Sequence, residues 1–317
     1  MAADTTKSLN SIDSGTLPDQ GIDHESATDI DLGIDLGTTR TVVARADRGN
    51  YPVISFTDEH GDEHDFIPSL TALHEGTLVH GFAARQAAHQ GAPLLRSLKR
   101  ILASPTLTAS TPVRLGDSTF SVLEVLTSYL RHLKSELADR GIDITRARVV
   151  VAVPAHAYGA QRLLTLEAFQ QAGFHVAAML NEPSAAGFEY THRKATTVSS
   201  KRTRVLVYDL GGGTFDTSLV DVVGTSHEVL ASHGLGDLGG DDIDLLMATM
   251  ALGRAGITEE ELSPTELDDL LDQCRDAKEH LTPQSRRVLI ILRGQDVVLP
   301  VSDLYTACTP LIERSLA

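Results

Sequence analysis

Two glycine-rich segments contain carboxylates and hydroxyls in the same order, each after a run of apolar residues. In LVYDLGGGTFD the polar and turn-forming positions are Asp209, Gly211, Gly212, Gly213, Thr214 and Asp216. In GIDLGTTR they are Asp35, Gly37, Thr38, Thr39 and Arg40. Glycine turns expose backbone N–H groups, which favour phosphate, and carboxylates beside them favour a hydrated divalent cation. For either segment alone, a tight hairpin whose acids only cap the turn is the alternative.

The two segments are about one domain length apart, and each lies between two predicted strands. We therefore expect two similar lobes that face each other across one triphosphate. The G-x-x-x-x-G-K-[ST] phosphate loop and the G-x-G-x-x-G dinucleotide motif both open a helix. Because each turn here opens a hairpin, neither of those two nucleotide-binding classes fits.

The composition is that of a globular protein, and it excludes several classes of partner. Of the 317 residues, 42% are hydrophobic and 22% charged. A net charge of −16 argues against nucleic acid or an anionic membrane as the main partner. No apolar run is long enough to span a bilayer, and the N-terminus lacks a secretory signal pattern. Cys274 and Cys308 have no metal-ligand spacing, so we expect reduced thiols in a cytoplasmic protein.

The first hairpin is expected in a lobe of residues 30–191, with an inserted subdomain at about 56–118. Within it we predict strands near 30–36, 41–46, 53–55 and 70–73, and helices near 81–90, 93–102 and 120–137. A strand at 148–153, a helix at 157–172, a strand at 174–180 and a short helix at 184–190 follow. This alternating order predicts a parallel sheet with helices on its faces.

Two charged residues of this lobe have a place that could matter for chemistry. Glu182 directly follows a predicted strand, at the sheet edge where ligands of such folds gather. A structural acid at a helix N-terminus is the alternative for Glu182. Lys99 lies on the helix predicted at 93–102, where a lysine usually faces solvent.

The second hairpin is expected in a lobe of residues 205–317, after a polar linker at 192–204. Here we predict strands at 204–208, 214–223 and 228–232, helices at 241–252, 263–281 and 302–316, a hairpin of 286–292 with 297–301, and an inserted subdomain at about 253–301. Gly239 and Gly240 precede the first of these helices, so their backbone could approach a ligand or form a structural turn. Residues 1–29 are polar and without periodicity, which predicts a disordered tail.

Seven segments, in order along the chain, resemble the nucleotide-binding domain of the seventy-kilodalton heat-shock (DnaK-like) chaperones, within the actin and hexokinase superfamily. They are GIDLGTT, FIPS, LKRIL, VVVAVPAHAYGAQR, LNEPSAAG, VYDLGGGTFD and GLGDLGGDDID, and the resemblance extends from Ile30 to about Leu316. It implies an α/β, two-lobed actin-like ATPase fold, in which two related mixed sheets have flanking helices and inserted subdomains. The second lobe is expected to be incomplete, because the sequence stops at Ala317, before the family's adenosine loop.

The same resemblance implies binding of ATP or ADP with Mg²⁺, and hydrolysis of ATP. Asp35 and Asp209 match the pair that holds the hydrated metal ion, and Lys99 matches the lysine that places the attacking water. Glu182, Asp216 and Thr214 match the groups that assist it. The implied phosphate cradle consists of Gly37, Thr38, Thr39, Gly211, Gly212, Gly213 and Thr214. Gly239 and Gly240 are expected near the phosphates, and Lys278 and Thr282 on the helix that flanks adenosine; Pro154 and Arg162 resemble residues that report the nucleotide state to a partner domain.

The sequence departs from the family pattern on both sides of the expected nucleotide. Arg40 stands where an aromatic residue is usual, and Glu279 replaces the arginine that packs on adenine. Arg275 also replaces an acid on the helix with Glu279. The contact with adenine is therefore expected to differ from that of the family.

Three functions are consistent with the sequence. The first is an ATP-hydrolysing domain that couples its nucleotide state to a partner or substrate domain. The second is a nucleotide-sensing or interaction module without hydrolysis, and the third is a sugar or acetate kinase of the same superfamily. Expected partners are the nucleotide and co-chaperone-like or nucleotide-exchange proteins, or a second copy of the chain that covers open strand edges of the second lobe.

Overall fold

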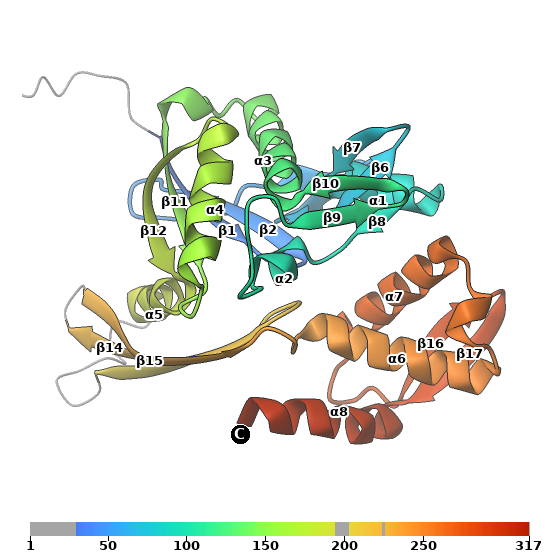
Figure 1. Cartoon of the computed structure of the whole chain (residues 1–317). Helices are drawn as coiled ribbons and strands as arrows, with labels where there is room; N and C mark the ends of the chain where they lie inside the picture. The colour runs from blue at the N-terminus through green and yellow to red at the C-terminus, as the bar shows by residue number, and fades with distance from the viewer. Residues whose placement is uncertain (1–29, 194–202, 224–225, 317) are drawn as a thin grey trace, which may run out of the picture.

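The structure is a computed structural model, and it describes residues 30–193, 203–223 and 226–316. The tail predicted at 1–29 and most of the linker predicted at 192–204 lie outside the described residues. Among the described residues, no helix is both long enough and apolar enough to cross a membrane. Figure 1 shows a mixed α/β molecule, with residues 30–193 on one side and residues 203–316 on the other. We call these the N-terminal part and the C-terminal part.

A five-stranded mixed sheet forms the centre of the N-terminal part. Its order is β12-β11-β1-β2-β5, and its strands are β1 (Ile30–Leu36), β2 (Arg40–Arg45), β5 (Ile67–Pro68), β11 (Ala147–Val153) and β12 (His175–Asn181). Strand β11 pairs in parallel with both β1 and β12, whereas β2 returns antiparallel to β1. The carboxyl ends of the three parallel strands therefore meet at one edge, where Asp35 and Glu182 lie.

Two long helices, α3 (Val122–Asp139) and α4 (Gly159–Gln171), pack against each other and share one core with this sheet. Leu126, Leu130 and Leu133 repeat at helical spacing on α3, and each is fully buried. They share this core with Val149 and Val151, the alternate buried residues of β11. Burial of apolar area on this scale fixes the sheet edge on which the site is built.

The segment between β2 and α3 consists of short strands and two helices: β3 (Phe56–Thr57), β4 (Glu63–His64), β6 (Thr71–His74), β7 (Thr77–His80), α1 (Gly81–His89), β8 (Leu94–Leu95), α2 (Leu98–Leu102), β9 (Pro112–Leu115) and β10 (Ser118–Ser121). A 3₁₀ turn, η1 (Ile144–Arg146), leads into β11, and α5 (Glu182–Arg193) follows β12. Helix α5 begins two residues earlier than the sequence predicted, with Glu182 and Pro183 in its first turn.

The C-terminal part has a three-stranded antiparallel sheet, in the order β13-β14-β15, and a separate helical region. The elements are β13 (Arg204–Leu210), β14 (Phe215–Val223), β15 (Ser226–Leu235), α6 (Gly240–Ala255), η2 (Glu259–Glu261), α7 (Pro264–Glu279), β16 (Arg287–Leu292), β17 (Gln295–Pro300) and α8 (Val301–Leu316). Met247, Ile290 and Leu299 are completely buried in a second core that joins α6, β16 and β17. Cys274 is a buried free thiol, and Cys308 is a half-buried one.

The helix predicted at 93–102 was wrong in its first half. Leu94 and Leu95 form β8, whose backbone pairs with Ala72 and Thr71 of β6. Ser97 has a left-handed backbone (φ 56°), so the helix cannot begin before Leu98. Tertiary pairing to an available strand edge thus prevails over an apolar pattern that is also compatible with a helix.

Two other boundaries differ for local reasons. The helix predicted from Phe120 begins at Val122, because Ser121 and Glu124 form a capping box. Phe120 instead belongs to the β9–β10 hairpin, which the sequence analysis did not anticipate. The strand predicted at 53–55 is only an isolated bridge between Val53 and Ala44. The division into two lobes with inserted subdomains at the stated bounds stays a prediction.

One buried histidine of the N-terminal part predicts an acid-sensitive fold. The ring of His80 is hydrogen-bonded to Thr71 and Ser128, and its burial, followed by the nearby His132, lowers its pKa to about 3. In the unfolded chain His80 binds a proton near pH 6.5, whereas in the folded chain it stays neutral down to about pH 3. The free energy of unfolding therefore falls as pH decreases through this window. From pH 6.5 to 5 we expect a loss of roughly 2 kcal/mol from His80.

Urea unfolding of the wild type and of His80→Gln at several pH values measures this contribution. The slope of stability against pH between 5 and 6.5 is expected to be smaller in the variant, and unchanged in His175→Gln, which alters an exposed histidine at the start of β12. Equal slopes for the wild type and His80→Gln would contradict the assignment.

Candidate functional site

A cavity of about 650 Å³ lies between the turn that joins β1 to β2 and the turn that joins β13 to β14. From the first turn and its strands it is lined by Asp35, Gly37, Thr38, Thr39 and Arg40, and from the second by Asp209, Gly211, Gly212 and Thr214. Lys99 and Glu182 line the same cavity. The structure therefore brings the two glycine-rich hairpins, with their acids, to one cleft.

The two turns touch each other directly, and glycine permits this approach. A Cβ on Gly212 would lie 2.4 Å from Cγ2 of Thr39, and one on Gly213 would lie 2.4 Å from Cγ2 of Thr38. Any side chain at these glycines would push the hairpins apart. The absence of a side chain at these glycines therefore lets the two parts of the chain meet.

Lys99 and Glu182 form the closest charge pair at the floor of the cleft, with 2.6 Å between Nζ and Oε1. Their side chains are only 10% and 14% exposed. Burial alone would lower the pKa of Lys99, but the carboxylates of Glu182, Asp35 and Asp209 raise it above its ordinary value. Lys99 is therefore a cation that several acids hold in place.

Asp209, the acid of the second hairpin, is only partly compensated by the positive charge of Lys99. Burial raises the pKa of Asp209, Asp216 and Asp35 raise it further, and Lys99 opposes them. Asp216 faces Asp209 across the β13–β14 ladder. It is not one of the described residues that line the cavity. Asp216 as a whole residue is 5% exposed, and its Oδ1 lies 2.5 Å from Nδ1 of His156.

The short helix α2 reaches across the cleft and fixes Lys99 against the C-terminal part. The Arg100 guanidinium donates to the carbonyl of Gly213 (2.7 Å) and to Asp242. The Ser97 hydroxyl donates to Asp241 at 2.5 Å. Sequence reasoning singled out Lys99 alone in this segment and missed Ser97, Arg100 and His156. Arg100 lies inside the motif LKRIL and His156 inside VVVAVPAHAYGAQR, whereas Ser97 directly precedes LKRIL.

Several predicted cofactor residues lie behind the cleft and contact protein groups. Gly240 donates its N–H to the carbonyl of Gly211 at 2.8 Å, and a Cβ on Gly239 would lie 2.6 Å from the carbonyl oxygen of Gly212. Nζ of Lys278 donates to the carbonyl of Gly240 (2.8 Å) and pairs with Asp244. Thr282 contacts Ser285 in the turn after α7. Their roles in nucleotide binding stay predictions.

Two of the three departures from the family pattern, Arg40 and Glu279, contact each other. The Arg40 guanidinium donates to the carboxylate of Glu279 on α7 and lies 4.5 Å above the ring centre of Phe66. The two charges therefore neutralise each other, and the ion pair connects the N-terminal part to the C-terminal part at the mouth of the cleft.

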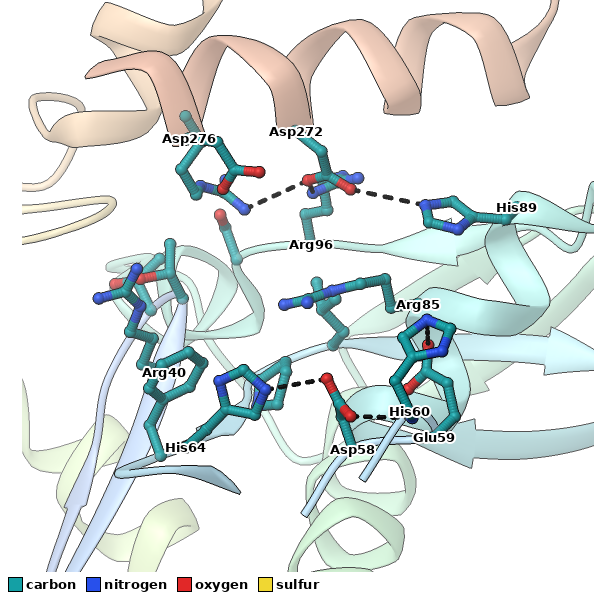
Figure 2. A pocket seen from close by; sticks show the side chains of 17 residues that line it. Arg40, Asp58, Glu59, His60, His64, Arg85, His89, Arg96, Asp272 and Asp276 are labelled. Atoms are coloured by element: carbon teal, nitrogen blue, oxygen red, sulfur yellow. Dashed lines mark hydrogen bonds and ion pairs between the residues drawn. The ribbon is translucent and has the colours of Figure 1, made fainter. Parts of the chain in front are cut away.

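A second cavity, of about 470 Å³, shares Thr38, Thr39 and Arg40 with the cleft. Figure 2 shows it between α7 and the short strands that follow β2, with the side chain of Arg85 extending into it. At its upper rim, Arg96 forms ion pairs with Asp268 (2.9 Å) and Asp272 (3.0 Å) of α7. Arg96 therefore makes a further connection between the two parts.

The donors in the main cleft suit a hydrated metal ion. Asp35 and Asp209 line the cavity from opposite sides. Among the described residues, no group of three or more His, Cys, Asp or Glu side chains could enclose a metal ion. Two carboxylates with a place for water and phosphate oxygens form the set that Mg²⁺ prefers over a dedicated protein cage.

Comparison of the sequence with known proteins shows the family of the chain. The model of the Hsp70 protein family matches residues 31–294. The chain belongs to the Hsp70 family. It is 35% identical over 309 residues to the chaperone protein HscA homolog of Laribacter hongkongensis strain HLHK9, and 34% identical over 307 residues to that of Burkholderia pseudomallei strain 668. Each match covers 90% of this chain and 48% of the relative, so the chain spans about half the length of these relatives.

The resemblance seen in the sequence is thus confirmed, as is the two-lobed actin-like α/β fold. Membership of the Hsp70 family implies nucleotide binding, and the matched region is the nucleotide-binding domain of an HscA-like chaperone.

The contact of Gly239 with the second hairpin gives a structural test of the cleft. Gly239→Ala places a methyl group 2.6 Å from the backbone oxygen of Gly212, and backbone cannot yield as a side-chain end can. We expect a loss of about 1–3 kcal/mol in the free energy of unfolding, together with weaker nucleotide binding. Urea unfolding and calorimetric titration with ATP measure the two effects.

Gly253→Ala is the matched control on the same helix, because a Cβ there meets nothing within 4 Å. It is expected to leave binding unchanged and to raise stability by up to ~1 kcal/mol, as alanine favours a helix interior. Unaltered stability and binding in Gly239→Ala would contradict the close packing of the two turns.

Proposed function

We propose that the chain binds ATP or ADP with Mg²⁺ and hydrolyses ATP, and that its nucleotide state acts on a partner or substrate domain in the manner of a chaperone. The observation that supports this best is the meeting of Asp35, Asp209, Lys99 and Glu182 in one cleft between two glycine hairpins. The sugar or acetate kinase has no comparable support, since the family match is to Hsp70.

In this proposal each side chain acts through position and charge. The backbone amides of the two turns and the hydroxyls of Thr38, Thr39 and Thr214 bind the phosphate oxygens. Asp35 and Asp209 would hold Mg²⁺ through water, and the ion would neutralise phosphate charge. Lys99, itself fixed by Glu182, orients the attacking water and stabilises negative charge on the transferred phosphoryl group. Preorganised charge of this kind supplies most of the catalysis in phosphoryl transfer.

A second candidate, a nucleotide-binding module without hydrolysis, is favoured by one specific contact. Arg40 and Glu279 pair with each other and differ from the family pattern at the expected adenine. Steady-state release of phosphate by the purified wild type separates the two candidates. Nucleotide-exchange or co-chaperone-like proteins, or a second copy of the chain, are the proposed partners, and the cytoplasm is the proposed compartment.

Lys99→Ala is the variant that tests hydrolysis. Removing the cleft cation that pairs with Glu182 should reduce single-turnover hydrolysis by at least about a hundredfold, whereas ATP affinity changes little. Lys134→Ala is the control, because that lysine contacts the carbonyl of Gly173 on the outside of α3. Unchanged single-turnover rates in Lys99→Ala, with circular dichroism confirming its fold, would refute the role of Lys99.

Asp209→Asn tests the metal site. In the wild type, ATP should bind about tenfold or more tightly with Mg²⁺ than without it, and the loss of one carboxylate should largely remove this difference. Calorimetric titrations with and without Mg²⁺ measure it, with Asp296→Asn, an exposed acid on β17, as control. A wild type that binds ATP equally well in both conditions would exclude a metal at this position.

A further inference from the structure

His156, which sequence reasoning did not single out, lies against the carboxylate of Asp216 behind the cleft. His156 is in the loop between β11 and α4, and its Nδ1 is 2.5 Å from Oδ1 of Asp216. The Asp216 side chain is 7% exposed and that of His156 is 28% exposed. In the described part of the chain neither atom makes a hydrogen bond of good geometry, and the ion pair between them is the polar contact that the structure records for both.

The backbone is shaped to admit this histidine. A Cβ on Gly234 of β15 would lie 2.4 Å from Cε1 and 2.5 Å from Nδ1 of the ring, and 2.9 Å from Oδ1 of Asp216. Gly234 is also the register partner of Asp216 in the β14–β15 ladder. The ring therefore packs on bare backbone beside the carboxylate that it contacts, and no other residue type at position 234 leaves room for it.

We propose that His156 is a positioning residue that holds the Asp216 carboxylate beneath the cleft and offsets its charge against a bound polyphosphate. This inference rests on the proposed nucleotide site. Asp216 carries a negative charge next to Asp209, and together with Glu182 and Asp35 it would repel phosphate. A cation on the far side of Asp216 complements Lys99, which compensates the other acids from within the cleft.

The charges around His156 come from three elements. The contact with Asp216 on β14 raises the pKa of His156, although burial opposes it; Glu182 on α5 also raises it, and Lys99 on α2 lowers it. The balance is a pKa above the ordinary 6.5, so the folded protein keeps the charged pair at pH 6.5 and loses it as pH rises through the raised value. Nucleotide affinity should therefore also decrease as pH rises.

The first experiment tests the pair without any nucleotide. Histidine side-chain NMR on the full chain should show a pKa above 6.5 for His156, and a lower pKa in Asp216→Asn. The signals of His175, which is exposed at the start of β12, serve as the internal reference in both proteins. An equal His156 pKa in the wild type and in Asp216→Asn would overturn the pairing.

The second experiment tests the role of the pair. Between pH 6 and 9, affinity for ATP with Mg²⁺ should weaken roughly three- to tenfold in the wild type. In His156→Gln, which retains an amide donor but no charge, the affinity should be weak and nearly independent of pH. His175→Gln should follow the wild type. Parallel profiles for His156→Gln and the wild type would overturn the proposal.

Two further outcomes are informative. If the wild type binds ATP but releases no phosphate, hydrolysis fails as a function, and the affinity profiles still decide the role of His156. If the wild type binds no nucleotide, both proposals fail together. Should His156→Gln not fold, Gly234→Ala is the substitute: it retains the histidine, displaces its ring, and should give the same flat profile.

Discussion

A single buried cation surrounded by acids is the constraint on which the site depends. Lys99 is almost removed from solvent and has Glu182, Asp35 and Asp209 around it. Acids gathered at this density in a partly buried cleft would destabilise the fold if no positive charge compensated them. The elements that place Lys99, namely helix α2 and its contacts with Gly213 and Asp242, are therefore as necessary to the cleft as the hairpins themselves.

The cleft is also a junction within the chain. The turns of two hairpins touch through glycines, and α2 of the N-terminal part bonds to the second turn and to the start of α6. Any group that enters between Asp35 and Asp209 must fit against both parts at once. The shape of this small site therefore depends on how the two parts of the chain lie relative to each other.

The sequence predicted the hairpins and the parallel strands, because strong local patterns specify them. That Lys99 and Glu182 belong to one site followed only from the resemblance to a family. It did not predict β8 or the start of α2, where the backbone of Leu94 joins an existing strand edge. Nor did it identify His156, whose meaning depends on a carboxylate from a distant strand and on the absence of a side chain at Gly234. Contacts between residues far apart in the chain leave no periodic signal.

The polar contacts across the cleft also have a consequence for ionic strength. Arg96, Arg100 and Arg40 of the N-terminal part bond to carboxylates of α6 and α7, and the Arg40 and Glu279 side chains are 41% and 40% exposed. At 0.15 M salt the screening length is about 8 Å, and it shortens to about 3 Å at 1 M. Concentrated salt should therefore weaken the polar contacts between the two parts, first of all the exposed pair of Arg40 and Glu279, before it affects either apolar core.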